Sequence, residues 1–138
     1  MRGNKISNEH MIKVAVCGAH MSGLPLNSQL LTLGGEFIEA TQTSLDYKLF
    51  VLNGFSPARP GLLKVIENGS AIDLEIWQLP IENYGKFVSG VPAPLGFGTL
   101  TLADGSEVQG FLCEAYATYD AIDISHLGGW RKHLKEIL

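Results

Sequence analysis

Tight turns between short apolar runs are the feature that most constrains the fold of this chain. Two Asx-Gly dipeptides, Asn68-Gly69 and Asp104-Gly105, each lie between such runs. This dipeptide favours the two-residue turns of β-hairpins, because both central residues of such a turn need a positive φ. Strands joined by hairpins pair antiparallel. The sequence therefore predicts a mainly antiparallel sheet.

The remaining elements follow from hydrophobic periodicity. The expected strands are Ile12–Cys17, Glu36–Thr43, Tyr47–Leu52, Leu62–Ile66, Ala71–Leu79, Thr99–Leu102 and Glu107–Glu114. We expect hairpins to join the fourth strand to the fifth and the sixth to the seventh. In the fifth strand, Asp73 and Glu75 alternate with apolar residues, which predicts that they lie on a wet face.

Two helices are expected on the periphery. The first begins after Pro80 and runs through Val88, because proline is favoured in the first turn of a helix. The second begins at Ser125 as an N-cap and runs to the C-terminus, with an apolar stripe at helical spacing. The stripe consists of Leu127, Trp130, Leu134 and Ile137. We therefore predict an α+β fold: a small, mainly antiparallel β-barrel with peripheral helices.

The 138 residues fit one domain, since domains of this length bury a sufficient core. Residues 1–11 are polar and are expected to form a flexible lead-in, which leaves 12–138 as a single domain. The net charge of −4 provides no basic surface, so nucleic acid is not an expected partner. No apolar stretch approaches the ~20 residues of a membrane helix. Cys17 and Cys113 lie within apolar runs, which favours buried free thiols and a cytoplasmic location.

His20 is the strongest candidate for a chemical role. It follows a predicted strand and lies in the loop Gly18–Asn27, which contains two glycines and a proline. Glycines allow backbone N–H groups to converge on an anion, and a histidine there could donate a hydrogen bond or transfer a proton. The simpler alternative is a loop histidine that satisfies a backbone carbonyl.

Other residues offer weaker signals. Arg59, in a proline-rich turn, could bind a carboxylate through two hydrogen bonds. Tyr47 and Lys48 are adjacent in a strand, so their side chains face opposite ways. Glu114 ends a strand, where catalytic carboxylates often lie. His126 and His133 share a helix face, but a third metal ligand is not evident. No metal site and no cofactor are predicted, and no nucleotide-binding motif is present.

Nine short blocks in order resemble the C-terminal domain of allophanate hydrolase, from residue 14 to about residue 134. They read VAVCGAHMSGLPLN (14–27), GGEFIEA (34–40), YKL (47–49), RPGL (59–62), EIWQLP (75–80), VPAPLGFG (91–98), ADG (103–105), GFLCE (110–114) and GGWR (128–131) with its following helix. The order and extent of these blocks make the resemblance far more specific than any single motif.

The resemblance implies a γ-glutamyl cyclotransferase-like fold whose first-strand loop binds a small carboxylated, urea-derived substrate. It implies that His20 is catalytic and that Gly18, Ala19, Met21 and Asn27 shape an anion pocket. Further wall residues by the same analogy are Tyr47, Lys48 and Arg59. The acidic residue of the cyclotransferases has no firm counterpart, and Glu82 and Glu114 are the nearest candidates. The activity implied is decarboxylation of N-carboxyurea or a similar small carbamate, after an amidase has deaminated allophanate.

Three functions stay open at the level of the sequence. The first is the decarboxylating enzyme just described, in urea and allophanate breakdown. The second is a non-catalytic module that binds and oligomerises a separately encoded amidase subunit, because this chain lacks the serine machinery of amidases. The third is a cyclotransferase acting on a γ-glutamyl amine. A homodimer is left open as well. An anion-filled pocket at His20 favours the first function, and an exposed apolar patch favours the second.

Overall fold

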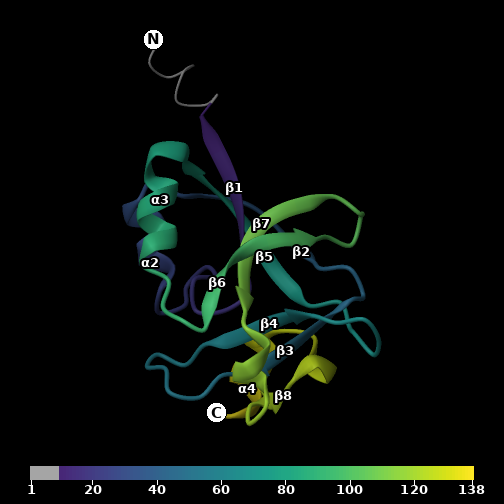
Figure 1. Cartoon of the computed structure of the whole chain (residues 1–138). Helices are drawn as coiled ribbons and strands as arrows, with labels where there is room; N and C mark the ends of the chain where they lie inside the picture. The colour runs from purple at the N-terminus through teal and green to yellow at the C-terminus, as the bar shows by residue number, and fades with distance from the viewer. Residues whose placement is uncertain (1–9) are drawn as a thin grey trace, which may run out of the picture.

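The computed structural model describes residues 10–138, which form two β-sheets with three α-helices around them (Figure 1). Most of the predicted lead-in, residues 1–9, lies outside the described residues. The larger sheet contains β1 (Met11–Val16), β2 (Glu36–Gln42), β5 (Asp73–Pro80), β6 (Leu95–Thr101) and β7 (Glu107–Cys113), in the order β2-β5-β1-β7-β6. The smaller sheet has the order β4-β3-β8, with β3 (Tyr47–Val51), β4 (Pro60–Lys64) and β8 (Ile122–Asp123).

The strand pairs are antiparallel except β1 with β7, which are parallel. The helices are α2 (Asn27–Thr32), α3 (Ile81–Ser89) and α4 (Trp130–Glu136), with two 3₁₀ turns, η1 (Ala115–Thr118) and η2 (Ser125–Leu127). Two isolated bridges add to this pairing: Thr43, just after β2, pairs with Leu102, just after β6, and Tyr47 of β3 pairs with Ser70, just before β5. The predicted α+β class with a mainly antiparallel, sheet-dominated core and peripheral helices is confirmed.

Strand β1 lies in the middle of the larger sheet, between β5 and β7. Its apolar run is buried without interruption from Val14 to Cys17, because both faces of the strand are covered. A buried central strand needs apolar side chains on both faces, which explains why this run does not alternate. The loop that carries His20 therefore begins at the buried end of the central strand of the larger sheet.

The hairpin predicted at Asn68-Gly69 is wrong. Asn68 does adopt a left-handed conformation, with φ 62°, so the turn chemistry was identified correctly. However, β4 pairs with β3, whereas β5 pairs with β1 and β2. The turn thus carries the chain from one sheet to the other. The hairpin at Asp104-Gly105 is confirmed, since β6 and β7 pair antiparallel around it.

The single C-terminal helix predicted from Ser125 is also wrong in its start. The 3₁₀ turn η2 ends at Gly128, whose φ of 82° breaks the helical path, and α4 begins only at Trp130. The Ser125 hydroxyl does not cap a helix but accepts a hydrogen bond from the Leu49 N–H at 2.9 Å. Trp130 is 2% exposed and anchors α4 to the core.

Candidate functional site

The loop after β1 is held in one conformation by its own hydrogen bonds. The Met21 N–H donates to the Gly18 carbonyl at 3.0 Å, and the Leu26 N–H donates to the Ala19 carbonyl at 2.8 Å. The Asn27 side-chain amide donates to the His20 carbonyl at 2.8 Å. The backbone around His20 is therefore fixed on both sides, by turns within the loop and by the start of α2.

His20 is buried, with 6% of its surface exposed. Its imidazole stacks on Phe111, with ring centroids 5.1 Å apart, and meets the edge of Phe87 at 5.2 Å. Its Nε2 atom is 2.8 Å from the Gln29 side-chain oxygen. The imidazole thus has two apolar neighbours and one polar neighbour, so its ring plane is set by packing and one of its nitrogens by a hydrogen bond.

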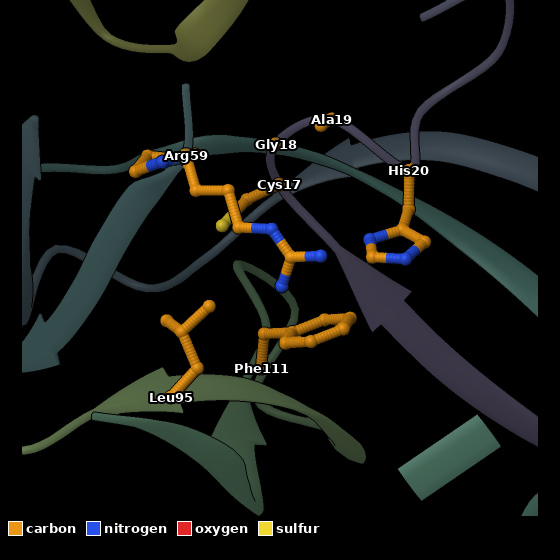
Figure 2. Close-up of a pocket in the computed structure, with 8 residues that line it drawn as sticks. Cys17, Gly18, Ala19, His20, Arg59, Leu95 and Phe111 are labelled. Carbon is orange, nitrogen blue, oxygen red and sulfur yellow. The ribbon is translucent and has the colours of Figure 1, made fainter. Parts of the chain in front are cut away.

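A small cavity adjoins this ring. It is lined by Cys17, Gly18, Ala19, His20, Arg59, Pro60, Leu95 and Phe111. Figure 2 shows the Arg59 side chain extending into this space toward the Phe111 and His20 rings. With Arg59 in this position the cavity measures about 20 Å³, which leaves room for about one water molecule. The Arg59 guanidinium also lies 5.5 Å from the centre of the Phe55 ring.

Gly18 allows the two sheets to approach closely at this cavity. A Cβ atom added to Gly18 would press against Pro60 at the start of β4, 2.7 Å from its Cγ. The close approach of Gly18 and Pro60 therefore joins the loop after β1 of the larger sheet to β4, the first residue of which is Pro60, in the smaller sheet. A glycine is needed here for space, and not for a special φ value.

The electrostatics of the cavity favour an anion and an uncharged imidazole. Burial lowers the pKa of His20, the Gln29 hydrogen bond opposes this, and the positive charge of Arg59 lowers the pKa further. Burial also lowers the pKa of Arg59, although the guanidinium stays charged at neutral pH. Within residues 10–138, the N–H groups of Gly18, Ala19 and His20 have no hydrogen-bond acceptor. The residues that carry these three unpaired N–H groups line the same cavity as the Arg59 cation, and an anion site needs unpaired donors and positive charge together.

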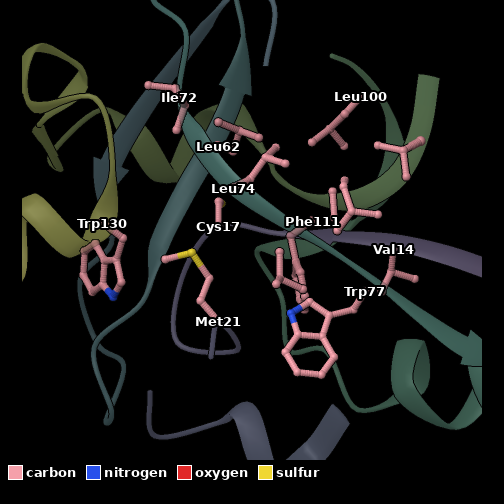
Figure 3. Packing of buried hydrophobic residues seen from close by; sticks show 14 of the residues in the cluster. Val14, Cys17, Met21, Leu62, Ile72, Leu74, Trp77, Leu100, Phe111 and Trp130 are labelled. Carbon is pink, nitrogen blue, oxygen red and sulfur yellow. The ribbon is translucent and has the colours of Figure 1, made fainter. Parts of the chain in front are cut away.

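The other predicted site residues lie elsewhere. Met21 turns into the core and lines a different hollow together with Trp130 (Figure 3). Tyr47 is fully buried, and its hydroxyl accepts the Thr101 N–H at 3.0 Å. Lys48 is 3.8 Å from the Asp123 carboxylate on the smaller sheet.

Neither acidic candidate lines the His20 cavity. Glu114 is exposed and borders a separate hollow beside Tyr116. Glu82 is exposed in the first turn of α3. The structure therefore brings together His20, Arg59, Gly18 and Ala19, with Asn27 supporting the loop from behind.

The sequence analysis missed a buried carboxylate next to this loop. Glu75 was expected on a wet face, but it is 7% exposed. It accepts hydrogen bonds from the Ser22 N–H at 2.8 Å, the Ser22 hydroxyl at 3.1 Å and the Trp77 indole at 3.0 Å. Arg131 adds an ion pair at 2.9 Å. Burial alone would raise the pKa of Glu75, but these hydrogen bonds outweigh it and hold the pKa below its ordinary value.

Two further observations describe the rest of the molecule. In the part of the chain that the structure describes, no three metal-ligating side chains gather. None of its helices is both long enough and apolar enough to cross a membrane.

Comparisons with known proteins place this geometry in a family. The sequence model of the allophanate hydrolase C-terminal domain matches residues 12–135. A urea amidolyase from Lachancea kluyveri is 42% identical over 138 residues, which cover 97% of this chain and 8% of that protein. The structure of an allophanate hydrolase from Kluyveromyces lactis matches with a TM-score of 0.88 and 37% identity, over 92% of this chain and 21% of that one.

A third relative has a similar length. It is a solved E. coli protein described as specific to uropathogenic strains, with a TM-score of 0.85 and 38% identity, covering 91% of this chain and 96% of its own. A γ-glutamyl cyclotransferase matches in fold alone, with a TM-score of 0.58 at 12% identity, as predicted from the sequence. This chain spans about a twelfth of the Lachancea kluyveri protein and about a fifth of the Kluyveromyces lactis chain. It belongs to the allophanate hydrolase C-terminal domain family.

Proposed function

We propose that this domain acts in urea and allophanate breakdown by promoting the decarboxylation of a small dicarboxylate, with His20 delivering the proton. One observation carries this proposal: a buried imidazole, the Arg59 cation and the residues of three unpaired backbone N–H groups line the same cavity. Donors of this kind, held in place before the substrate arrives, stabilise negative charge at little reorganisation cost.

The chemistry of allophanate identifies the substrate more closely than the sequence did. Allophanate is itself N-carboxyurea, so N-carboxyurea is not the product of its deamination. Hydrolysis of its amide releases ammonia and leaves N-carboxycarbamate, a nitrogen that bears two carboxylates. Decarboxylation of N-carboxyurea would only return urea. N-carboxycarbamate is therefore the carbamate that we propose for this cavity.

The proposed step balances with one proton. The bond between nitrogen and one carboxylate breaks, carbon dioxide leaves, and the bonding electrons stay on nitrogen, which takes a proton to give carbamate. The unliganded His20 is uncharged at neutral pH, because its pKa is lowered. Two carboxylates beside the ring would raise this pKa, since an anion favours the imidazolium form. Binding of the dianionic substrate thus favours uptake of a proton by His20, and the decarboxylation then consumes this proton.

Arg59 and the loop amides are proposed to hold the carboxylates. With the guanidinium in place, the cavity holds only about 20 Å³, so Arg59 must move to admit the substrate. In its new position the guanidinium binds a carboxylate through two N–H groups. A positioned proton donor contributes on the order of 10²–10⁴-fold to a rate. This suffices for a carbamate that also loses carbon dioxide unaided.

The proposal includes an amidase partner that supplies the substrate. The relatives in which this domain is part of a longer chain are a urea amidolyase and an allophanate hydrolase, which supports joint action with an amidase. Both cysteines of the described chain are free and buried, as suits the reducing cytoplasm that we propose as its location.

The test couples the purified domain to a stand-alone amidase fed with allophanate and follows carbon dioxide release after deamination. We expect His20→Ala to slow release at least tenfold, while His126→Ala, an exposed control, leaves it unchanged. Malonate, a stable analogue with CH₂ in place of NH, should bind the wild type and bind Arg59→Ala more weakly. If His20→Ala matches the wild type, the catalytic role is wrong and a scaffold for the amidase takes its place.

A further inference from the structure

Gln29 contacts the side of the His20 ring that faces away from the cavity. It is the third residue of α2, and its side-chain oxygen is 2.8 Å from His20 Nε2. An amide oxygen only accepts hydrogen bonds, so this contact is a hydrogen bond in the tautomer that carries the proton at Nε2. The other nitrogen, Nδ1, then has the free lone pair, and Figure 2 shows it on the side of the ring that faces Arg59.

The aromatic neighbours of His20 cannot make this choice. Phe111 stacks against the ring and Phe87 meets it edge-on, so both hold the ring plane. Neither distinguishes a nitrogen from a carbon, because a ring rotated by half a turn presents the same apolar faces to them. Among the residues that the structure describes, Gln29 is the one side chain bonded to an imidazole nitrogen of His20.

We propose that Gln29 is a positioning residue for His20, which fixes the tautomer so that Nδ1 faces the cavity and is free to take up the reacting proton. The inference rests on the proposed function, in which His20 delivers that proton. A histidine is commonly oriented in this way by the partner of its second nitrogen, and the identity of the partner sets the basicity of the first.

An amide suits this role better than a carboxylate would. A carboxylate at the position of Gln29 would stabilise the imidazolium and keep His20 protonated before the substrate arrives. An amide fixes the same tautomer without that charge, so protonation follows the arrival of the dianion. Arg59 shares the cavity, and its positive charge also lowers the pKa of His20, so it too favours the uncharged ring in the empty site.

The remaining titratable groups around the ring are few. Cys17 shares the cavity, and burial raises the pKa of its thiol to about 12. Helix α2 carries no titratable side chain. On α3, which supplies Phe87, Glu82 and Lys86 are exposed and Tyr84 packs against Phe97. Strand β7, which supplies Phe111, has Glu107 and Cys113 at its two ends. Arg59 and Gln29 are thus the polar side chains that set the charge of His20.

Two variants of Gln29 separate these effects. Gln29→Leu keeps the size of the side chain and removes the acceptor, whereas Gln29→Glu keeps an acceptor and adds a charge. Ser28→Ala, on an exposed neighbour in the same helix, is the matched control. Nitrogen NMR of the imidazole reports directly which ring nitrogen is protonated, and the His20 signals are identified by their loss in His20→Ala.

The wild type and Ser28→Ala should show one tautomer, protonated at Nε2. Gln29→Leu should show a mixture of both tautomers and lose about tenfold in the coupled release of carbon dioxide, the usual cost of losing such an outer partner. Gln29→Glu should keep the Nε2 tautomer while raising the pKa of His20 by about one unit or more. Its pH–rate profile should move to higher pH by the same amount.

The outcomes distinguish this inference from the proposed function. If Gln29→Leu retains a single Nε2-protonated tautomer and the wild-type pH–rate profile, the positioning role of Gln29 is overturned even though His20 stays catalytic. If His20→Ala releases carbon dioxide at the wild-type rate, the proposed function is overturned, and the catalytic part of the Gln29 role is overturned with it.

Discussion

Replacing Glu75 with glutamine should cost this domain about 2 kcal/mol of unfolding free energy at neutral pH. One oxygen of Glu75 accepts the bonds from Ser22 and Trp77, and a glutamine oxygen can still accept these. The other oxygen accepts from Arg131 at 2.9 Å, and there the variant would place an NH₂ group against a cation. A hydrogen bond to a charged group contributes about 1.5–3 kcal/mol, and the Arg131 side chain is 46% exposed, so we take the lower part of this range.

The pH dependence tests the physical origin of this loss. The pKa of Glu75 lies below its ordinary value in the folded protein, so its stabilising contribution is fully present above the pKa of the unfolded chain. The contribution is lost as the pH falls through the folded pKa. Glutamine does not titrate. The difference between wild type and Glu75→Gln should therefore be constant near neutral pH and should close as the pH falls through the folded pKa of Glu75.

Urea unfolding followed by tryptophan fluorescence measures this difference, because both tryptophans are buried. A loss of about 2 kcal/mol corresponds to a fall of about 7 °C in Tm for a chain of this length. Glu67→Gln, on an exposed turn residue, is the control and should change neither value. A variant within about 0.5 kcal/mol of the wild type at neutral pH, or a difference that persists at acid pH, would refute the reasoning.

Two further predictions concern the contact of Gly18 with Pro60 and the two buried thiols. Gly18→Ala should destabilise the domain by about 1–3 kcal/mol and weaken malonate binding, because the new Cβ would lie 2.7 Å from Pro60 Cγ; unfolding and titration calorimetry measure both. Gly85→Ala, whose Cβ would meet open space on α3, should instead gain about 0.5–1 kcal/mol, and equal effects of the two variants would contradict the steric argument. Burial raises the thiol pKa values of Cys17 to about 12 and of Cys113 to about 11, so Ellman's reagent should label them in urea but not in the native protein at mildly alkaline pH. Rapid labelling of the native protein would disprove this.

Local sequence patterns predicted the strands and turns of this fold better than they predicted which strands pair with each other. The uninterrupted apolar run of β1 and the Asp104-Gly105 turn were read correctly, because each is decided by neighbours in the sequence. The Asn68-Gly69 turn was also recognised, but which strands pair around it depends on contacts between distant residues. The break at Gly128 was missed because glycine is compatible with a helix end and with its interior, and the surrounding contacts decide between them.

The candidate site was predictable in its centre and not in its surroundings. The loop pattern pointed to His20, and the proline-rich turn pointed to Arg59. Nothing local indicated that Gln29 bonds His20 or that Glu75 is buried. Alternation placed Glu75 on a wet face, but Arg131, 56 residues later, covers it. Side chains that are brought together only by the folded chain leave no periodic signal.

The contact of Gly18 with Pro60 has a consequence for how ligand binding and folding depend on each other. One wall of the cavity comes from the larger sheet and the other from the start of the smaller sheet, so the cavity exists only while the two sheets are docked. A ligand that binds there must favour the docked state, in proportion to RT ln(1 + [L]/Kd). The measured affinity then depends on how stably the two sheets are docked. A substitution far from the cavity that loosens this docking weakens binding without contacting the ligand.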